Sequence, residues 1–318
     1  MLRRLALCLA ALLAIPALAQ TWPTKPVRIV VPFPPGGSAD PIGRAIATKL
    51  QESLGSPFVV ENRPGASGAL GTAQVAKAPP DGHAWVVVFD THAVNPFLIE
   101  KMPFDKGELQ PVMLVGTAPL AIATHPGKPY KTMADVVDAA RRNPGAVTFG
   151  SVQNGSTGHL QMMLWQDATG LKLTHAPYKG AAPMVTDLLG GHIELGIGSA
   201  AVIVPQVRSG RLRGLAVTSA DRSPGMPDVQ TFKEAGFTNM DAYAWWGIYG
   251  TAGVPQAIVE RFHAEVVKAL GAPDVRGQLE NQLGMKLVLS SPADMARFVD
   301  GEMAKWGRIV KQHSIRSD

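Results

Sequence analysis

The residues of this chain whose types and spacing best suit binding chemistry lie in a glycine-rich turn after a short apolar run. Residues 27–31 are mostly β-branched and predict a strand, and Gly36 and Gly37 then allow a tight turn. Asp40 suits the N-cap of a following helix, with Pro41 at its first position. The first N–H groups of such a helix lack partners and carry a partial positive charge. The segment therefore predicts either an anion site or an ordinary strand-to-helix connection.

Two segments in the middle of the chain show the same order of a strand, a glycine-containing turn and a helix. Residues 175–183 place a break at Lys179 and Gly180 between a strand and a helix with Pro183 in its first turn, so two helix N-termini are expected to face one cleft. Residues 150–159 supply short polar groups and glycines before a further helix. Ser156 in that segment is equally explained as an N-cap.

Catalytic chemistry has little support in the sequence. The chain contains no G-x-S-x-G elbow, no H-E-x-x-H and no G-x-x-x-x-G-K-[ST]. His159, His175 and His192 could in principle converge on a metal, but separate histidines without a metal are the simpler interpretation. A hydrolase that uses Ser156 with a nearby histidine stays open as an alternative. We expect no cofactor and no metal.

The elements that must position these residues alternate along the chain. Strand-like and helical runs in turn predict βαβα units and a mostly parallel sheet with helices on its faces. Strands are expected at 27–31, 57–61, 84–89, 147–150, 171–176, 193–197 and 212–218, and helices at 42–54, 68–78, 132–142, 156–169, 181–190, 255–271, 275–284 and 292–312. A loop is expected through Asn95 and Pro96.

Two long extended runs, near 115–124 and 243–251, bound the middle of the chain. They are expected to cross between two domains, with a ligand cleft and a hinge where they cross. One large continuous sheet is the alternative. Trp245 and Trp246 are expected either to line the cleft or to pack in the core.

The N-terminus and the cysteine content indicate an exported protein. Residues 1–19 combine Arg3 and Arg4, an apolar run and a small-residue pattern ending at Ala19, which predicts a signal peptide cleaved after Ala19. Cys8 is the single cysteine, so the mature chain has none. This excludes disulfides, thiol nucleophiles and cysteine metal sites from the mature protein.

The charge balance is mild. Loss of Arg3 and Arg4 with the signal peptide lowers the formal net charge from +5 to +3. No run of Lys and Arg indicates nucleic acid, and the small positive balance favours anionic small molecules at most.

Several motifs in order resemble one family, the Bug-type periplasmic receptors of the tripartite tricarboxylate transporters. They are WPTKPVRIVVPFPPGGSADPIGR, VVENRPGASGALGTAQVAKAPPDGH, YKGAAPMVTDLLGGHIELGIG and LAVTSADRSPGMPDVQTFKEAGF, and the likeness covers almost all of the mature chain. The resemblance implies an α/β fold of the two-domain periplasmic binding protein type (Venus-flytrap, type II-like), with two crossover strands and a cleft between domains. We expect domain 1 at 20–120 and 248–318, and domain 2 at 121–247.

The resemblance also implies a site in which backbone amides and water hold a ligand carboxylate. The matching ligand-binding positions here are Phe33, Pro34, Gly36, Gly37, Ser38, Ala39, Asp40, Thr91, His92, Ala93, Gly155, Ser156, Thr157, Gly158, Tyr178, Lys179, Gly180, Gly198 and Ser199.

One departure from the family pattern bears on specificity. Many relatives carry Asp-Asn after the DLLGG segment, where this chain has Gly198-Ser199. The loss of that acid predicts a ligand without a cationic amine, or a pocket enlarged for an aromatic or branched acid.

The resemblance implies a monomeric periplasmic protein that delivers a small carboxylate to integral-membrane transporter subunits without chemistry. A sensor subunit for a signalling kinase is the alternative output.

Overall fold

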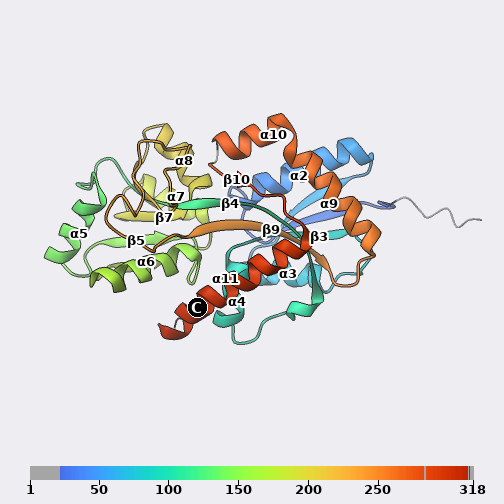
Figure 1. Ribbon diagram of the computed structural model, residues 1–318, viewed down its shortest axis with the longest axis horizontal. Coiled ribbons are helices and arrows are strands. Elements are labelled where there is room, and N and C mark those ends of the chain that lie inside the picture. Colours follow the sequence, from blue (N-terminus) through green and yellow to red (C-terminus); the bar gives the residue numbers. More distant parts are fainter. Residues whose placement is uncertain (1–21, 283, 314, 316–318) are drawn as a thin grey trace, which may run out of the picture.

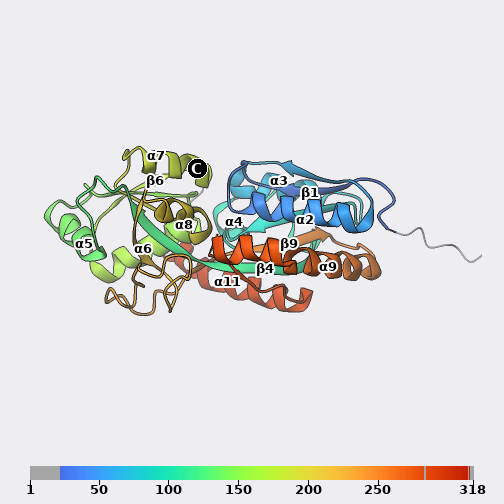
Figure 2. The same ribbon diagram turned by 90° about the horizontal axis from the view of Figure 1, so that it is seen from above.

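The computed structural model describes residues 22–282, 284–313 and 315, so the predicted signal peptide lies outside the described residues. The chain forms two α/β lobes side by side, joined by the long strands β4 (Leu109–Thr124) and β9 (Tyr243–Thr251) (Figures 1 and 2). Within the described ranges, no helix has both the length and the apolar character needed to cross a membrane.

The first lobe is built on the parallel strands β2, β1 and β3, in that order in the sheet, followed by β9 and the first part of β4. Its elements are β1 (Val27–Val31), β2 (Phe58–Asn62), β3 (Ala84–Phe89), β10 (Lys286–Leu287), α2 (Ala39–Leu54), α3 (Ala69–Ala76), α4 (Thr91–Leu98), α9 (Gln256–Gly271), α10 (Pro273–Gly277) and α11 (Pro292–Gln312). Short 3-10 turns lie at Ala66–Gly68 and Lys106–Glu108, and a π-helical turn at Gln278–Gln282.

The second lobe is built on β7, β5 and β6, which are parallel, and on β8, which pairs with β4. Its elements are β5 (Thr148–Ser151), β6 (Thr174–Pro177), β7 (Leu195–Ser199), β8 (Arg213–Val217), α5 (Met133–Arg142), α6 (Thr157–Thr169), α7 (Ala181–Leu189) and α8 (Ala200–Arg208).

The two predicted crossovers are confirmed as β4 and β9. These strands pair antiparallel from Leu109 with Thr251 to Pro119 with Tyr243, and from Leu120 onward β4 pairs with β7 and β8 instead. The strands therefore form one hydrogen-bonded path through both lobes, so the two hypotheses, two domains and one continuous sheet, each describe part of the fold. The change of partners lies beside the expected boundary at 120/121, and the domain limits themselves stay predictions.

The cores follow from the apolar patterns of the sequence. Ile42, Ile46 and Leu50 lie on one face of α2 and are fully buried, as their spacing predicts. Trp85 of β3 stacks on Phe262 of α9, with ring centroids 4.1 Å apart. The C-terminal helices thus return to cover the first sheet.

Some sequence predictions of the elements were wrong. The segment through Asn95 and Pro96 is helix α4, because burial of Ala93 and Val94 outweighs the hydrogen bond that Pro96 removes. Helix α8 was missed, and in place of the single helix expected from 275 the chain forms α10, which ends at Gly277, and a π-helical turn at Gln278–Gln282. The sheet is antiparallel at its centre, because a chain that crosses to the second lobe and returns must run in opposite directions.

Candidate functional site

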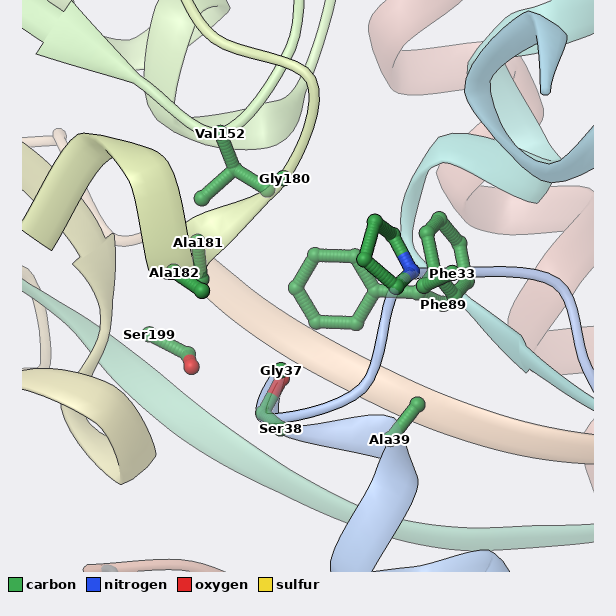
Figure 3. Close-up of a pocket in the computed structure, with 11 residues that line it drawn as sticks. Phe33, Gly37, Ser38, Ala39, Phe89, Val152, Gly180, Ala181, Ala182 and Ser199 are labelled. Atoms are coloured by element: carbon green, nitrogen blue, oxygen red, sulfur yellow. The ribbon is translucent and has the colours of Figure 1, made fainter. Parts of the chain in front are cut away.

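A cleft lies between the lobes where three strand-to-helix loops meet (Figure 3). The empty volume of the cleft, including the part that is open to solvent, is about 410 Å³. The lining residues come from both lobes and carry no charged side chain: Phe33, Pro34, Gly37, Ser38, Ala39, Phe89, Val152, Gly180, Ala181, Ala182 and Ser199. A neighbouring hollow shares Gly37, Ser38, Ala181 and Ala182 and adds Gly36 and residues of α8, so the cleft continues between α2, α7 and α8.

The first loop, between β1 and α2, presents the start of α2 to the cleft. Gly36 has φ +81°, a left-handed conformation that favours glycine. Ser38 occupies the N-cap position of α2 without a side-chain capping bond. The backbone N–H groups of Gly37, Ser38 and Ala39 have no hydrogen-bond acceptor within the described part of the chain. They are therefore available to an anion.

Asp40 braces this loop from behind, and its predicted N-cap role was wrong. It lies in the first turn of α2, where it accepts hydrogen bonds from Arg44 Nε at 3.0 Å, Asn62 Nδ2 at 3.0 Å and the Gly36 N–H at 3.5 Å. Burial alone would raise the pKa of Asp40, but these donors together hold it below its ordinary value. Pro41 consequently lies third in the helix, because α2 begins at Ala39 and not at Pro41.

The second loop presents the start of α7 from the facing lobe. Gly180 has φ +131°, and its N–H donates to the Val152 carbonyl at 2.9 Å, which ties this loop to the preceding one. In the described residues the N–H groups of Ala181 and Ala182 have no acceptor, and Pro183 has no N–H. Two helix N-termini on opposite lobes thus face the cleft, as the sequence predicts.

A third helix N-terminus joins them at Ser199, the N-cap of α8. Sequence reasoning named Ser199 but missed the helix that follows it; the apolar run from Ala200 to Val204 was its signal. Each helix N-terminus carries roughly half a positive charge, so three of them favour an anion without any cationic side chain.

The apolar wall of the cleft is aromatic. The rings of Phe33 and Phe89 meet edge to face at 5.9 Å, and Trp246 of β9 lies 5.4 Å from Phe89. Trp246 is fully buried and its Nε1 donates to Ser38 Oγ at 3.2 Å. Trp246 therefore supports the cleft from behind, and Trp245, also fully buried, packs on Phe298 of α11.

A larger hollow opens beside the cleft and shares Pro34 with it. The predicted residues Tyr178 and Lys179 line this hollow together with Asn95, Gln153 and Asn154. Tyr178 donates from its hydroxyl to Asp187 Oδ2 at 2.7 Å, and burial with the nearby carboxylate raises the pKa of Tyr178 to about 12. Tyr178 and Lys179 thus line the hollow beside the cleft and not the cleft itself.

The predicted segment Gly155 to Gly158 lies at a lobe contact and does not line the cleft. Gly155 has φ +71°, and a Cβ there would lie 2.0 Å from Cδ1 of Leu98 on the opposite lobe. Ser156 is the N-cap of α6, with its Oγ accepting from the His159 N–H at 3.4 Å. Its N-cap interpretation is confirmed.

The other predicted positions also lie away from the cleft lining. Thr91 is buried and donates to the Ser67 carbonyl at 3.0 Å, and Ala93 is fully buried in the core. His92 lines a different cavity in the first lobe. Gly198 lies behind Ser199, close to Val202.

Three buried polar atoms around this lobe contact have no hydrogen-bond partner among the described residues. They are Asp90 Oδ1 and Asn95 Oδ1 from the first lobe, and Gln153 Oε1 from the second. Burial raises the pKa of Asp90 to about 8; Glu302 adds to the rise, and Thr157 on the facing lobe offsets part of it. The junction therefore carries polar groups that opening of the lobes would hydrate.

The two serines closest to histidines in the second lobe lie outside the lining of the cleft. Ser156 bonds a backbone N–H, and Ser151, whose Oγ lies 2.8 Å from His175 Nε2, is fully buried. His175 stacks on His159 at 3.8 Å. Throughout the described ranges, no three His, Asp or Glu side chains group as a metal-binding set.

Comparisons with known proteins agree with this architecture. Residues 42–315 match the tripartite tricarboxylate transporter family receptor, TctC. BugT of Bordetella pertussis is 35% identical over 303 residues, covering 94% of this chain and 93% of BugT. A UPF0065 protein from the tcbD–tcbE intergenic region of Pseudomonas sp. strain P51 is 35% identical over 301 residues, covering 94% of this chain and 89% of that protein.

Solved structures give the same answer for the fold. Rpa4515 of R. palustris with adipate aligns with a TM-score of 0.88 at 33% identity, covering 93% of this chain and all of that one. MatC of Rhodopseudomonas palustris with bound malate gives 0.84 at 28% identity, covering 91% of this chain and all of MatC, and the periplasmic binding protein BugD gives 0.86 at 28%, covering 93% and 100%. The chain thus has a two-domain periplasmic binding protein fold and belongs to the Bug-type, TctC family of tripartite tricarboxylate transporter receptors.

Proposed function

We propose that this receptor binds a small carboxylate in the cleft between its lobes. The observation that carries the proposal is the convergence of the N-termini of α2, α7 and α8 on a cleft without charged side chains. Such a site binds an anion through backbone N–H groups and helix dipoles. Two relatives of the same fold hold dicarboxylates, adipate in Rpa4515 and malate in MatC.

The remainder of the ligand lies against the apolar wall of Phe33, Phe89 and Val152. No acidic side chain lines the cleft. An ammonium group would lose its hydration there without a counter-charge. The ligand is therefore a carboxylate without a cationic amine, with an aliphatic or aromatic body.

The mature protein begins after Ala19, works in the periplasm as a monomer and delivers its ligand to integral-membrane transporter subunits. Domain 1 comprises 20–120 and 248–318, and domain 2 comprises 121–247. The lobes close on the ligand by bending where β4 and β9 cross, and the membrane subunits recognise the closed form.

Thermal unfolding of the mature protein against mono-, di- and tricarboxylic, amino and aromatic acids tests this function. A ligand at a hundredfold its dissociation constant adds about 2.7 kcal/mol, and each kcal/mol raises the midpoint by roughly 2–4 °C at this size. One class of acid without an amine is expected to raise the midpoint by several degrees. A rise with amino acids alone would contradict the specificity, and no rise with any acid would contradict the carboxylate proposal.

A further inference from the structure

A second cavity lies in the first lobe, enclosed by α4, α11 and the segment 102–109 that leads into β4. It shares no lining residue with the cleft. Its empty volume, including the part that is open to solvent, is about 680 Å³. Most of its wall is apolar or aromatic, with Met102, Phe104, Val299 and Met303 among the lining residues. It is therefore a separate pocket of small-molecule size.

Two polar side chains that line this pocket, Tyr249 and His92, have no hydrogen-bond partner in the described part of the chain. Tyr249 is 6% exposed, and its hydroxyl makes no hydrogen bond within the described ranges. The ring of His92 lies 4.8 Å from that of Tyr249 and is parallel to Phe104 at 6.1 Å. Its nitrogens likewise have no hydrogen-bond partner among the described residues. The pocket therefore presents one hydroxyl and one imidazole whose hydrogen-bonding capacity is open to a small molecule.

The interior of the pocket offers hydrogen bonds from two uncharged groups, and its two charged lining residues, Asp105 and Lys106, are exposed at its edge. Burial, with a smaller contribution from Lys106, lowers the pKa of His92 to about 4, so its imidazole is neutral near pH 7 and has one donor and one acceptor nitrogen. Burial also raises the pKa of Tyr249, which stays protonated. At that edge Lys106 is ion-paired with Asp300, and the Asp105 side chain accepts from the Glu108 N–H. A charged group held between His92 and Tyr249 would therefore lose hydration without a counter-charge beside it.

The geometry points to a compact, uncharged aromatic molecule with a hydroxyl group, a ligand of the phenol class, bound between His92 and Tyr249. Its ring lies among Met102, Phe104 and Met303, where thioether and aromatic contacts favour a flat ring. Its hydroxyl donates to the acceptor nitrogen of His92 and accepts from the Tyr249 hydroxyl.

Calorimetric titration of the mature protein with phenol tests this site. We expect saturable binding of one molecule in the micromolar to millimolar range, which suits a ligand of this size. Tyr249→Phe keeps the ring and removes the hydroxyl, and it should weaken phenol binding by about threefold to tenfold, the equivalent of one hydrogen bond. Toluene, which cannot make this bond, should bind equally to both proteins.

Val299→Phe fills the pocket and should abolish phenol binding, whereas Val59→Phe, at a position 48% exposed on β2, should leave it unchanged. Met303→Trp is a second filling variant if Val299→Phe does not fold. Carboxylate binding should persist in each folded variant, so the two sites are judged separately. Absence of saturable phenol binding to the wild-type protein would overturn the proposal, as would binding that a folded filling variant leaves intact.

Discussion

Two kinds of loop between the lobes look alike in sequence and differ in structure. The first kind comprises the loops at 33–40 and 177–182, and the second is the loop at 152–158. All three contain glycine and link a strand to a helix. The first two leave backbone N–H groups open to the cleft, whereas Gly155 packs on Leu98 and Thr157 faces Asp90 across the junction. A glycine turn before a helix therefore predicts an available N-terminus, and the opposing lobe decides whether a ligand or a side chain meets it.

The largest expected effect concerns Asp90, the buried carboxyl at the contact between the lobes. Burial raises the pKa of Asp90 from 3.8 to about 8. Between these pH values the carboxyl is ionised in the unfolded chain and protonated in the folded one, so the free energy of unfolding falls as the pH rises from about 4 to about 8. Below that window both states are protonated and the penalty vanishes. Asp90→Asn removes this slope, and at pH 8 we expect it to be more stable than wild type by several kcal/mol in chemical unfolding. Parallel pH profiles for the two proteins would contradict the assignment.

Gly155 tests whether the lobe contact limits closure. Gly155→Ala and Gly170→Ala both place a side chain at similar positive φ, +71° and +66°, which costs about 1 kcal/mol. Only the first creates a close contact, with Leu98, since no atom of the described residues lies within 4 Å of the Cβ position at Gly170. This backbone cost should lower the free energy of unfolding of both variants by a similar amount. Only Gly155→Ala should also bind the carboxylate more weakly. Equal carboxylate affinities of the two variants, measured calorimetrically, would show that the contact between Gly155 and Leu98 does not limit closure of the lobes.

Ala181→Pro sharpens the role of the backbone donors in the cleft. Proline is tolerated at the first position of α7, because Gly180 is already extended with ψ 172°, and it removes one N–H that faces the cleft. Loss of a hydrogen bond to a charged group is worth about 1.5–3 kcal/mol, so affinity should fall at least tenfold. Gln256→Pro makes the same change at the exposed start of α9 and should leave affinity unchanged. Equal affinity of the two variants would refute carboxylate binding at α7.

The smallest effect distinguishes two serine N-caps. Ser156 Oγ caps α6, so Ser156→Ala should lower the free energy of unfolding by about 1 kcal/mol without changing affinity. Ser199 makes no side-chain capping bond and lines the cleft, so Ser199→Ala should change ligand affinity and leave stability nearly unchanged. Urea unfolding and calorimetry of both variants would show whether the two roles are reversed.

Much of the fold was predictable because it depends on local patterns. The stripe of Ile42, Ile46 and Leu50 specified a helix face, and the uninterrupted apolar runs specified both crossovers. Helix α4 was not predictable in the same way, because Pro96 is a local helix breaker and only burial against the core stabilises that turn.

The sequence by itself determined where helix N-termini follow glycine turns, because φ preference, proline position and apolar spacing act within a few residues. It could not determine which of these turns share the cleft. Phe89, Val152 and Ala182 line it through contacts between segments far apart in the chain, whereas Asp40 turns back to Arg44 and Asn62. His92 follows the cleft-lining Phe89 by three residues and still points into another cavity. Tertiary structure decided these outcomes, because the direction of a side chain at a lobe interface depends on what the opposite element leaves open.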